Sequence, residues 1–533
     1  MTRLSSRVSA SCRCVLALLV CASPASFGAP PADLDAYAQG LLTRFETPGM
    51  LVVVVERGQP AVVRGYGVRR AGTPAKVDGD TLFAIGSTTK AFTGAVLSTM
   101  VDEGKLAWDS KVVDLLPGFR MYDSYASAEM TVRDLLVHRS GLGTGTGDLL
   151  YFPPSDFSRA DIVHKLRYLP PASSFRSTFA YTNIMYVVAG EVIDAVGGAP
   201  WEQQVRDRIL TPLGMNATTT TSRLPADANR AWPHARIASE LRGEGPVVPL
   251  VQPLLIDSAA AAGAINSNGN DIARWLEVQL GRGLDPRTGK RLWSEAQARE
   301  MWAPQMIVPV APNPKPIELA QAHFKGYAHG WIVSDYRGEQ VISHGGGVSG
   351  MVCQLVILPG RDVAFGLFIN SEEAYALGAL RERLLDHYLG LPSPDWASAY
   401  AEVATARVSA ARESLAQAAA QAKLAGGSRS TPSLPLDGYV GKYQDAWYGG
   451  ARIERDGKEL RIAFDHTPAL SGPIVHVRYD TFLARWPDRS FEDAYVTFQL
   501  GADGSVESMK LRPVSPIADF SFDYGDLLFK PVR

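Results

Sequence analysis

The hydrophobic pattern of the chain changes near residue 392. Before that point, stretches with apolar residues three and four positions apart, typical of helices, alternate with short apolar runs, typical of strands. The helical stretches cover 32–45, 87–103, 181–197, 201–210, 271–280 and 377–389, and the strand-like runs cover 50–55, 61–68, 327–333, 340–343, 351–358 and 363–370. Helices mixed with successive antiparallel strands predict one α+β domain over residues 30–392.

Two different patterns follow beyond residue 392. Residues 393–435 are expected to form a linker, whose Ala-rich part, 401–425, predicts a helix that ends at Gly426. From residue 436 the apolar runs become short, and Asp-Gly pairs between them are good hairpin turns. These runs cover 439–443, 451–454, 460–464, 481–486, 494–500 and 508–511. We therefore expect a smaller all-β accessory domain over residues 436–533, either a barrel or a sandwich.

The stretch around Ser87 has the pattern of a reactive serine. A strand-like run, 81–85, stops at Gly86 and a helical pattern follows, so Ser87 is expected at a helix N-terminus with Lys90 one turn later. A serine becomes a nucleophile when a neighbouring base takes its proton, and a lysine is such a base when burial lowers its pKa. On its own, the spacing fits a helix-capping serine followed by a solvated lysine better.

Two later motifs supply further polar groups. Tyr181-Thr182-Asn183 brings a phenol and an amide together where a loop meets a predicted helix. His344-Gly345-Gly346-Gly347 follows a strand-like run, and its glycines would let a substrate approach the edge of a sheet. Taken singly, the first motif fits a plain helix start better, and the second a plain glycine turn.

Composition limits the class of protein without identifying its chemistry. The 533 residues are too many for one ordinary core, and 46% hydrophobic with 20% charged residues is typical of a soluble globular protein of two or more domains. The net charge of −2 favours neither nucleic acid nor an anionic membrane surface as a partner. We expect a small-molecule or peptide substrate, and composition leaves the oligomeric state open.

The first 25 residues have the pattern of a secretory signal peptide. Arginines precede an apolar run, 15–22, that is too short for a stable membrane anchor, and small residues before position 26 suit cleavage after Ala25. A lipoprotein modified at Cys21 is the alternative. We expect the mature chain to be periplasmic or secreted, without a transmembrane segment. It would keep only Cys353 of the four cysteines, so no intrachain disulfide is expected.

Other candidates for chemistry have plainer interpretations. His138 is expected to stabilise a turn, His329 either lines a cleft or packs structurally, and Cys353 is expected to be a buried strand residue. The histidines lack the His-Glu-x-x-His spacing of a zinc hydrolase, so we predict no metal and no cofactor. No Gly-x-Ser-x-Gly surrounds Ser87, which argues against an α/β-hydrolase. Three aromatic residues are available to line a cleft: Tyr151, Phe152 and Phe157.

Taken together, the ordered motifs resemble those of the serine β-lactamase-like hydrolases. This group holds class C β-lactamases, D-alanyl-D-alanine carboxypeptidases, D-aminopeptidases and related esterases. Its order of Ser-x-x-Lys, Tyr-x-Asn and Lys/His-x-Gly corresponds to Ser87/Lys90, Tyr181/Asn183 and His344/Gly346. The resemblance covers about residues 32–390, including 135–142, and implies an antiparallel sheet flanked by helices. The C-terminal part is similar to a β-domain of unknown function that is often appended to such hydrolases.

The resemblance also implies roles for the first two motifs. Ser87 would be the acyl-accepting nucleophile, and Lys90 and Tyr181 would share the work of the general base. Tyr181 needs a lowered pKa for this, which Lys90 would supply if both side chains were buried. Asn183 would hold either the substrate amide or the Lys90 side chain.

The third motif departs from the usual pattern of the group. β-Lactamases and carboxypeptidases usually carry lysine where this chain has His344, and a neutral imidazole holds a substrate carboxylate less firmly than an ammonium. Gly346 and Gly347 would belong to the substrate-binding strand, and the N–H groups of Ser87 and Gly347 would form the oxyanion hole.

These observations predict a secreted serine hydrolase that acts through an acyl-enzyme on Ser87. An esterase or a D-amino-acid peptidase or amidase is favoured by His344. A β-lactamase or penicillin-binding carboxypeptidase is the alternative within the group. A non-catalytic binding or scaffold protein that kept the fold is the hypothesis from another class.

Overall fold

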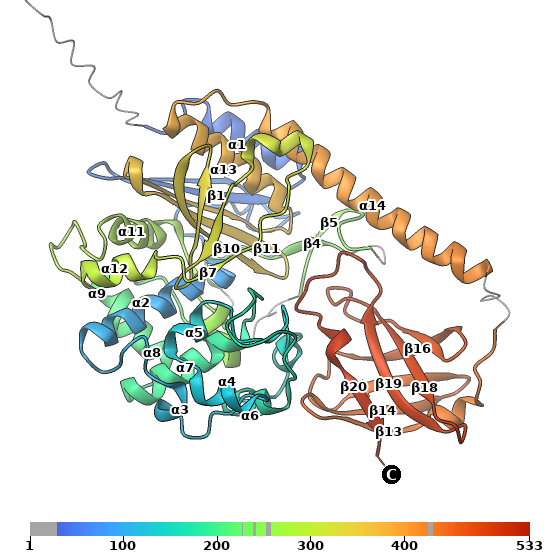
Figure 1. The fold of residues 1–533 in the computed structure, drawn as a ribbon. Coiled ribbons are helices and arrows are strands. Elements are labelled where there is room, and N and C mark those ends of the chain that lie inside the picture. The colour runs from blue at the N-terminus through green and yellow to red at the C-terminus, as the bar shows by residue number, and fades with distance from the viewer. Residues whose placement is uncertain (1–28, 226, 238–240, 252–256, 425–429, 533) are drawn as a thin grey trace, which may run out of the picture.

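The computed structural model describes residues 29–225, 227–237, 241–251, 257–424 and 430–532 (Figure 1). The predicted signal peptide, 1–25, and Cys21 within it lie outside the described residues. The predicted fold class is confirmed, because an antiparallel sheet flanked by helices is followed by an all-β domain. Across these five ranges, no helix is both long and apolar enough to cross a membrane.

An eight-stranded antiparallel sheet forms the centre of the first domain, in the order β2-β1-β12-β11-β10-β9-β8-β7. Its central strands are rich in buried Val, Leu, Ile and Phe, since helices cover both faces. β1 pairs with β12 from Met50–Ile369 to Glu56–Val363, so the two ends of the domain meet within the sheet, one strand in from the β2 edge. The strands are β1 Gly49–Glu56, β2 Val62–Gly67, β7 Met306–Ile307, β8 Lys325–Tyr327, β9 Ile332–Tyr336, β10 Glu339–Val348, β11 Met351–Leu358 and β12 Val363–Ile369. Two short pairs lie apart from the sheet, β3 Phe83–Ala84 with β6 Asn266–Ser267 and β4 His234–Arg236 with β5 Val247–Pro249.

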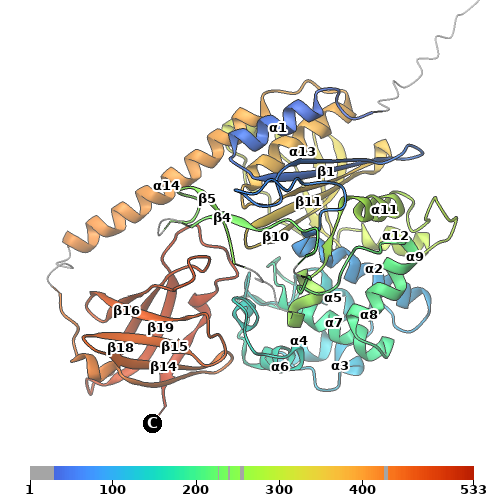
Figure 2. The same cartoon turned by 180° about the vertical axis from the view of Figure 1, so that it is seen from behind.

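Helices cover the two faces of the sheet unequally (Figures 1 and 2). On one face, α1, α13 and the start of α14 share a hydrophobic core with β1 and β12. The other face carries a larger helical region in which α2 packs against α7, α10 and α12 and is buried on nearly all sides. The helices are α1 Leu34–Arg44, α2 Thr89–Asp102, α3 Val112–Leu115, α4 Ser124–Glu129, α5 Val132–Leu136, α6 Arg159–Lys165, α7 Ile184–Gly197, α8 Trp201–Val205, α9 Thr211–Leu213, α10 Ala260–Gly263, α11 Gly269–Leu280, α12 Glu295–Met301, α13 Ala374–Leu389 and α14 Trp396–Leu424.

Two expected strands have different limits in the structure. The run 327–333 is interrupted at Gly330, whose positive φ of 79° turns the chain between β8 and β9. The run 340–343 belongs to a longer strand, β10, which continues through His344 and the three glycines and pairs with β11. The interpretation of these glycines as a plain turn is therefore wrong. Backbone hydrogen bonds need no side chain, so the glycines extend the strand while leaving its surface open.

The C-terminal domain is a closed barrel of eight antiparallel strands. β20 pairs with both β19 and β13, which decides between the barrel and the sandwich. Two of its strands have no counterpart in the hydrophobic pattern: Gly472 and Pro473 interrupt the pattern of β16, and β20 has only four residues. The strands are β13 Gly441–Asp445, β14 Gly449–Asp456, β15 Glu459–Phe464, β16 Ser471–Arg478, β17 Thr481–Ala484, β18 Ala494–Leu500, β19 Val506–Pro513 and β20 Leu528–Pro531.

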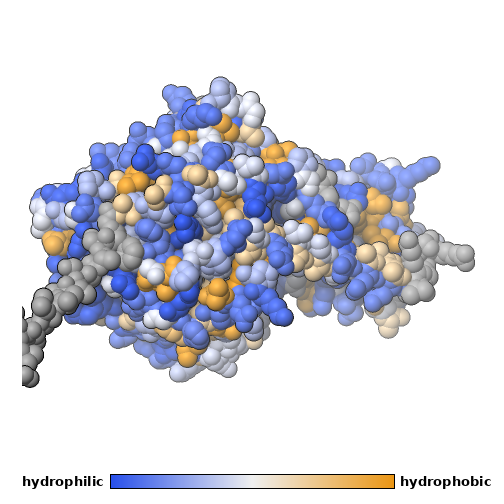
Figure 3. All heavy atoms as spheres, turned by 90° about the horizontal axis from the view of Figure 1, so that it is seen from above, coloured by the Kyte–Doolittle hydropathy of each residue, from blue (hydrophilic) through white to orange (hydrophobic). Residues whose placement is uncertain are grey.

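The long helix α14 leads from the sheet to the barrel, which lies beside the helical region (Figure 2). Gly426, where the sequence predicts the end of this helix, lies outside the described residues. The barrel contacts the first domain directly, for example through His466 Nδ1 and Asp156 Oδ1, which are 2.7 Å apart. The face seen in Figure 3 is mainly hydrophilic, with hydrophobic side chains in small separate patches.

Candidate active site

Ser87 lies in a short 3-10 helix, Gly86–Thr88, that leads into α2, so it stands at a helix N-terminus as the sequence predicts. Its position depends on a close approach between this turn and β10. Gly86 has a positive φ of 48°, and a Cβ atom there would lie 2.7 Å from the Gly347 nitrogen. Only glycine permits both features, so the turn brings Ser87 directly beside β10.

Lys90 lies one helical turn later and is fully buried. Its Nζ is 2.9 Å from Ser87 Oγ, 2.7 Å from Asn183 Oδ1 and 2.9 Å from the Ala262 carbonyl oxygen. Burial disfavours the charged ammonium and lowers the pKa of Lys90 to about 7, while the negative charge of Asp148 opposes that change. The alternative of a solvated lysine is therefore wrong. A lysine with this pKa next to a serine hydroxyl is suited to accept its proton.

Tyr181 lies over the same lysine, with Lys90 Nζ 5.1 Å from the centre of its ring. The expectation that Lys90 lowers the pKa of Tyr181 is wrong. Burial raises that pKa, and although a hydrogen bond with Ser87 opposes the rise, the charges of Asp148 and Asp519 add to it. Tyr181 is therefore a neutral phenol beside the nucleophile, able to pass a proton but not to act first as the base.

Asn183 connects Lys90 to a second buried group. It stands at the N-cap position of α7 but makes no capping hydrogen bond. Instead, its Oδ1 accepts from Lys90, and its Nδ2 donates to Asp148 Oδ2 at 2.9 Å. Of the two roles that the resemblance implies for Asn183, the structure therefore places it on the lysine side chain.

His344 is a neutral imidazole in this site. Its Nδ1 is 2.6 Å from the Gly345 carbonyl oxygen, which can only accept, so Nδ1 carries the proton and Nε2 accepts from the Tyr327 hydroxyl at 2.7 Å. Burial lowers the pKa of His344 to about 3, and the charge of Lys90 adds to this effect. The side chain therefore offers no positive charge at neutral pH.

The glycines that follow His344 have separate positions. Gly347 lines the pocket beside Ser87, with its nitrogen at the Gly86 turn. Gly346 does not line the pocket, because it faces the segment before Ser87, where an added Cβ would lie 2.0 Å from the Ile85 carbonyl oxygen. The expected substrate contact of Gly346 is thus replaced by close packing of β10 on the Ser87 turn.

A family model described as Beta-lactamase matches residues 34–390, which contain all of these residues. The chain belongs to the β-lactamase family. Residues 427–531 match a second model, described as a domain of unknown function, DUF3471.

Two named proteins and a solved structure are similar to this chain over long stretches. The chain is 26% identical over 485 residues to a protein of Aspergillus violaceofuscus named unguisins hydrolase ungD. The aligned region covers 85% of this chain and 82% of that protein. It is 29% identical to penicillin-binding protein 4 of Amycolatopsis lactamdurans, over 67% of this chain and 89% of that protein. A solved D-amino acid amidase from Ochrobactrum anthropi has a similar fold, with a TM-score of 0.54, 23% identity, and coverage of 67% of this chain and 98% of the amidase.

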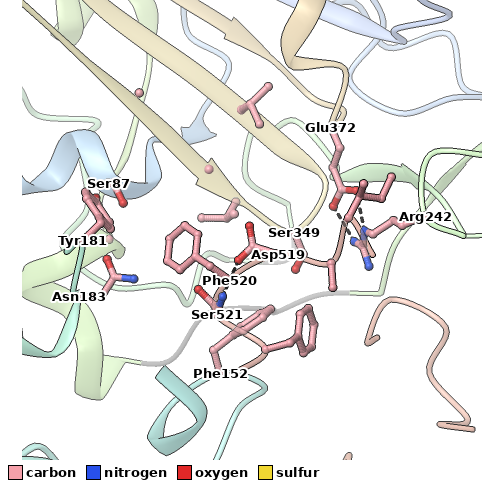
Figure 4. Close-up of a pocket in the computed structure, with 18 of the residues that line it drawn as sticks. Ser87, Phe152, Tyr181, Asn183, Arg242, Ser349, Glu372, Asp519, Phe520 and Ser521 are labelled. Carbon is pink, nitrogen blue, oxygen red and sulfur yellow. Dashed lines mark hydrogen bonds and ion pairs between the residues drawn. The ribbon is translucent and has the colours of Figure 1, made fainter. Parts of the chain in front are cut away.

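In this β-lactamase-family chain, Ser87 opens into a pocket of about 810 Å³. Tyr151 and Phe152 line it as expected, whereas Phe157 packs against His466 of the barrel, with ring centres 4.1 Å apart. One wall comes from the barrel, where Asp519, Phe520 and Ser521 lie between Ser87 and the ion pair of Arg242 with Glu372 (Figure 4). Arg407 of α14 also lines the pocket.

The remaining sequence candidates support the site without lining it. His138 lies in the turn after α5, but its side chain accepts a hydrogen bond from the Thr182 nitrogen at 3.1 Å and packs on the Tyr181 ring, so it holds that segment and not its own turn. His329 packs against Trp108 with ring centres 4.2 Å apart and does not line the pocket. Cys353 is buried in β11, as expected, and burial raises the pKa of its thiol to about 12.

Asp148 is the important residue that sequence reasoning missed. It is fully buried in the loop-rich stretch after α5 and accepts hydrogen bonds from Asn183, Tyr151 and Ser521. Burial raises the pKa of its carboxyl to about 6, although the three hydrogen bonds oppose the rise. The neighbouring residues show no motif, and Ser521 is 373 positions away in the sequence.

Proposed function

We propose that this chain is an exported serine hydrolase that cleaves an ester, amide or peptide bond through an acyl-enzyme on Ser87. The observation that carries the proposal is the distance of 2.9 Å between Lys90 Nζ and Ser87 Oγ, together with a lysine pKa of about 7. A large share of such a lysine is unprotonated at neutral pH and can take the serine proton. Ser87 itself is partly exposed to the pocket, so a substrate can reach it.

The proposed reaction proceeds in two halves. Lys90 accepts the Ser87 proton while Ser87 Oγ attacks the substrate carbonyl carbon, and the N–H groups of Ser87 and Gly347 stabilise the oxyanion, each donor by about 3 kcal/mol in comparable sites. Tyr181 then gives its phenolic proton to the leaving alcohol or amine and is reprotonated by Lys90, and the acyl group stays on Ser87. A water molecule next attacks the acyl carbon and Lys90 accepts its proton; the bond between that carbon and Ser87 Oγ then breaks, Lys90 returns the proton to Oγ, and the acid is released.

The charge of the pocket favours some substrates over others. β-Lactams and carboxypeptidase substrates carry a carboxylate, which needs a positive partner. His344 is neutral here, and of the three arginines that line the pocket, two, Arg236 and Arg242, form ion pairs with Glu373 and Glu372, while Arg407 belongs to α14. This supports an esterase or a D-amino-acid peptidase or amidase over a β-lactamase or penicillin-binding carboxypeptidase.

Asp519 adds a negative charge to the same pocket. Its side chain accepts a hydrogen bond from the Ser521 nitrogen at 2.9 Å and raises the pKa of Tyr181 through its charge. A carboxylate near the nucleophile attracts an ammonium group and repels a carboxylate. Among the proposed substrates, those with a free amine near the bond to be cleaved therefore fit best.

The experiment is intact-mass spectrometry of the mature protein with p-nitrophenyl acetate and, separately, with a fluorescent penicillin. We expect rapid ester turnover, a transient acyl mass on Ser87 and little penicillin adduct, and Ser87→Ala should lose both the turnover and the acyl mass. A stable penicilloyl adduct with slow ester turnover would favour the carboxypeptidase alternative. Full hydrolysis by Ser87→Ala would overturn the proposal.

The scaffold hypothesis and the location outside the cytoplasm can be tested separately. A binding protein has no use for a lysine whose pKa is held near 7 beside a serine, which speaks against the scaffold hypothesis. If no serine-directed acylating probe labelled the chain, that result would support a scaffold. Export is proposed from residues 1–25. It predicts that the chain made in bacteria loses these residues and is released by osmotic shock.

A further inference from the structure

The segment between β19 and β20 ties the barrel to the loop that carries Asp148. Asp523 accepts from the Gly147 nitrogen at 2.8 Å and from the Leu149 nitrogen at 3.1 Å. Asp526 Oδ2 lies 2.7 Å from Thr146 Oγ1. The backbone on both sides of Asp148 is thus held by the barrel.

The same segment also contacts the Asp148 side chain. Ser521 Oγ donates to Asp148 Oδ2 at 2.7 Å, the same oxygen that accepts from Asn183 Nδ2 at 2.9 Å. The other carboxylate oxygen accepts from the Tyr151 hydroxyl. A buried carboxylate needs such donors to stay ionised, and one of its three side-chain donors comes from the barrel.

The direction of the Asn183 amide follows from this carboxylate. An ionised carboxylate can only accept, so it selects the NH₂ end of the amide and leaves the oxygen to face Lys90. Lys90 Nζ then donates to Asn183 Oδ1 at 2.7 Å while it contacts Ser87. If the amide were reversed, its NH₂ group would face the lysine and displace it.

We propose that Ser521 and Asp148 are positioning residues, through which the accessory barrel fixes the orientation of Asn183 and hence the place of Lys90 at Ser87. This inference rests on the proposed function, since it assigns the barrel a part in the same serine chemistry. The barrel is then a component of the active site and not a separate binding module.

The charged groups around this chain of contacts define its pH behaviour. Lys90 is faced by Asp148, by the neutral His138 and His344, and by the rings of Tyr181 and Tyr186. Asp148 is faced by Tyr151, Asp519 and Asp523. Of these groups, Asp148 is the one whose negative charge raises the pKa of Lys90.

The test compares single variants of the full-length protein in p-nitrophenyl acetate hydrolysis. Ser521→Ala is expected to lower kcat roughly tenfold with KM little changed, because Ser521 lines the pocket but its hydroxyl donates to Asp148, so its loss acts on the base. Ser521→Thr keeps the hydroxyl and should restore most of kcat. Ser505→Ala is the matched control, since Ser505 also bonds an aspartate in the barrel, at an exposed turn that does not line the pocket.

A second variant, Asp148→Asn, tests the charge of Asp148 through the pH profile, which a loss of packing alone would not shift. Asp148→Asn removes the charge that raises the pKa of Lys90, so the acid limb of kcat/KM should move to lower pH and the maximal kcat should fall further than in Ser521→Ala. Thermal unfolding of each variant shows whether the protein is still folded.

The outcomes separate this inference from the proposed function. If Ser87→Ala keeps the activity, the proposed function fails. If Ser87→Ala is inactive but folded Ser521→Ala keeps the wild-type kcat and pH profile, the positioning role of Ser521 is overturned. An Asp148→Asn protein with an unmoved acid limb overturns the link from Asp148 to Lys90.

Discussion

Lys90 Nζ lies 2.9 Å from Ser87 Oγ, and its two other contacts are with the neutral oxygens of Asn183 and Ala262. Neutral acceptors stabilise an ammonium less than a carboxylate in direct contact would. Burial therefore has the largest effect on the pKa of Lys90, and the charge of Asp148 acts on it only from the far side of Asn183. This balance makes Lys90 suited to act as a base at neutral pH, and four predictions follow from it and from the pocket around it.

The first prediction concerns pH. The active form of Lys90 is unprotonated, so kcat/KM for a neutral ester should increase as pH increases through about 7, the pKa of Lys90. Protonation of the amine below that pH removes the base. The measurement is the pH dependence of p-nitrophenyl acetate hydrolysis, corrected for the spontaneous reaction. A rate independent of pH between about 6 and 8 would exclude Lys90 as the base.

The second prediction concerns the cost of burying Lys90. Lys90→Met should lower kcat/KM about a thousandfold, within the usual range for loss of a general base. It should also leave the melting temperature unchanged or higher, since an apolar side chain needs no hydration. Steady-state kinetics and calorimetry test both parts, with the exposed Lys442→Met as the control. A marked loss of stability in Lys90→Met would contradict this account.

The third prediction distinguishes neighbouring glycines of β10. Gly346→Ala should destabilise the protein by about 1–3 kcal/mol, because its Cβ would lie 2.0 Å from the Ile85 carbonyl oxygen and the Ser87 turn would have to move. Activity should fall with it. Gly345→Ala is the matched control, because its nearest contact would be 3.8 Å away. Equal denaturation midpoints for the two variants would argue against the close packing of β10 on this turn.

The fourth prediction concerns substrate charge. Asp519→Asn should lower kcat/KM roughly tenfold for a D-amino acid p-nitroanilide with a free amine, because the ammonium loses its partner. It should leave the N-acetylated form of the same compound unaffected. The comparison is made at low salt, where exposed charges act most strongly. A parallel loss on both compounds would show that Asp519 acts on the fold of the segment and not on charge.

Several features of the site follow from local sequence alone. They are the Ser87–Lys90 spacing, the helix after Gly86 and the strand-like runs of β11 and β12. Each depends on residues that are close together in the sequence, and the structure has each where the pattern predicts it. The limits of β10 were less predictable, because the glycines after His344 have no side-chain pattern and belong to the strand through pairing with β11. The two barrel strands that the pattern did not predict, β16 and β20, also depend on pairing; β20, for example, is defined by its hydrogen bonds to β13 and β19.

The sequence by itself determined the fold class, the ordered motifs and the neighbourhood of Ser87 and Lys90, because periodicity and short spacings encode local geometry. The tertiary structure decided the rest. It brought Asp148 and Ser521 together across 373 residues and turned Asn183 away from capping α7. It also buried Lys90 deeply enough to lower its pKa, and raised that of Tyr181 by the same cause. Burial and long-range hydrogen bonds depend on how segments distant in the sequence pack together, and no local pattern records them.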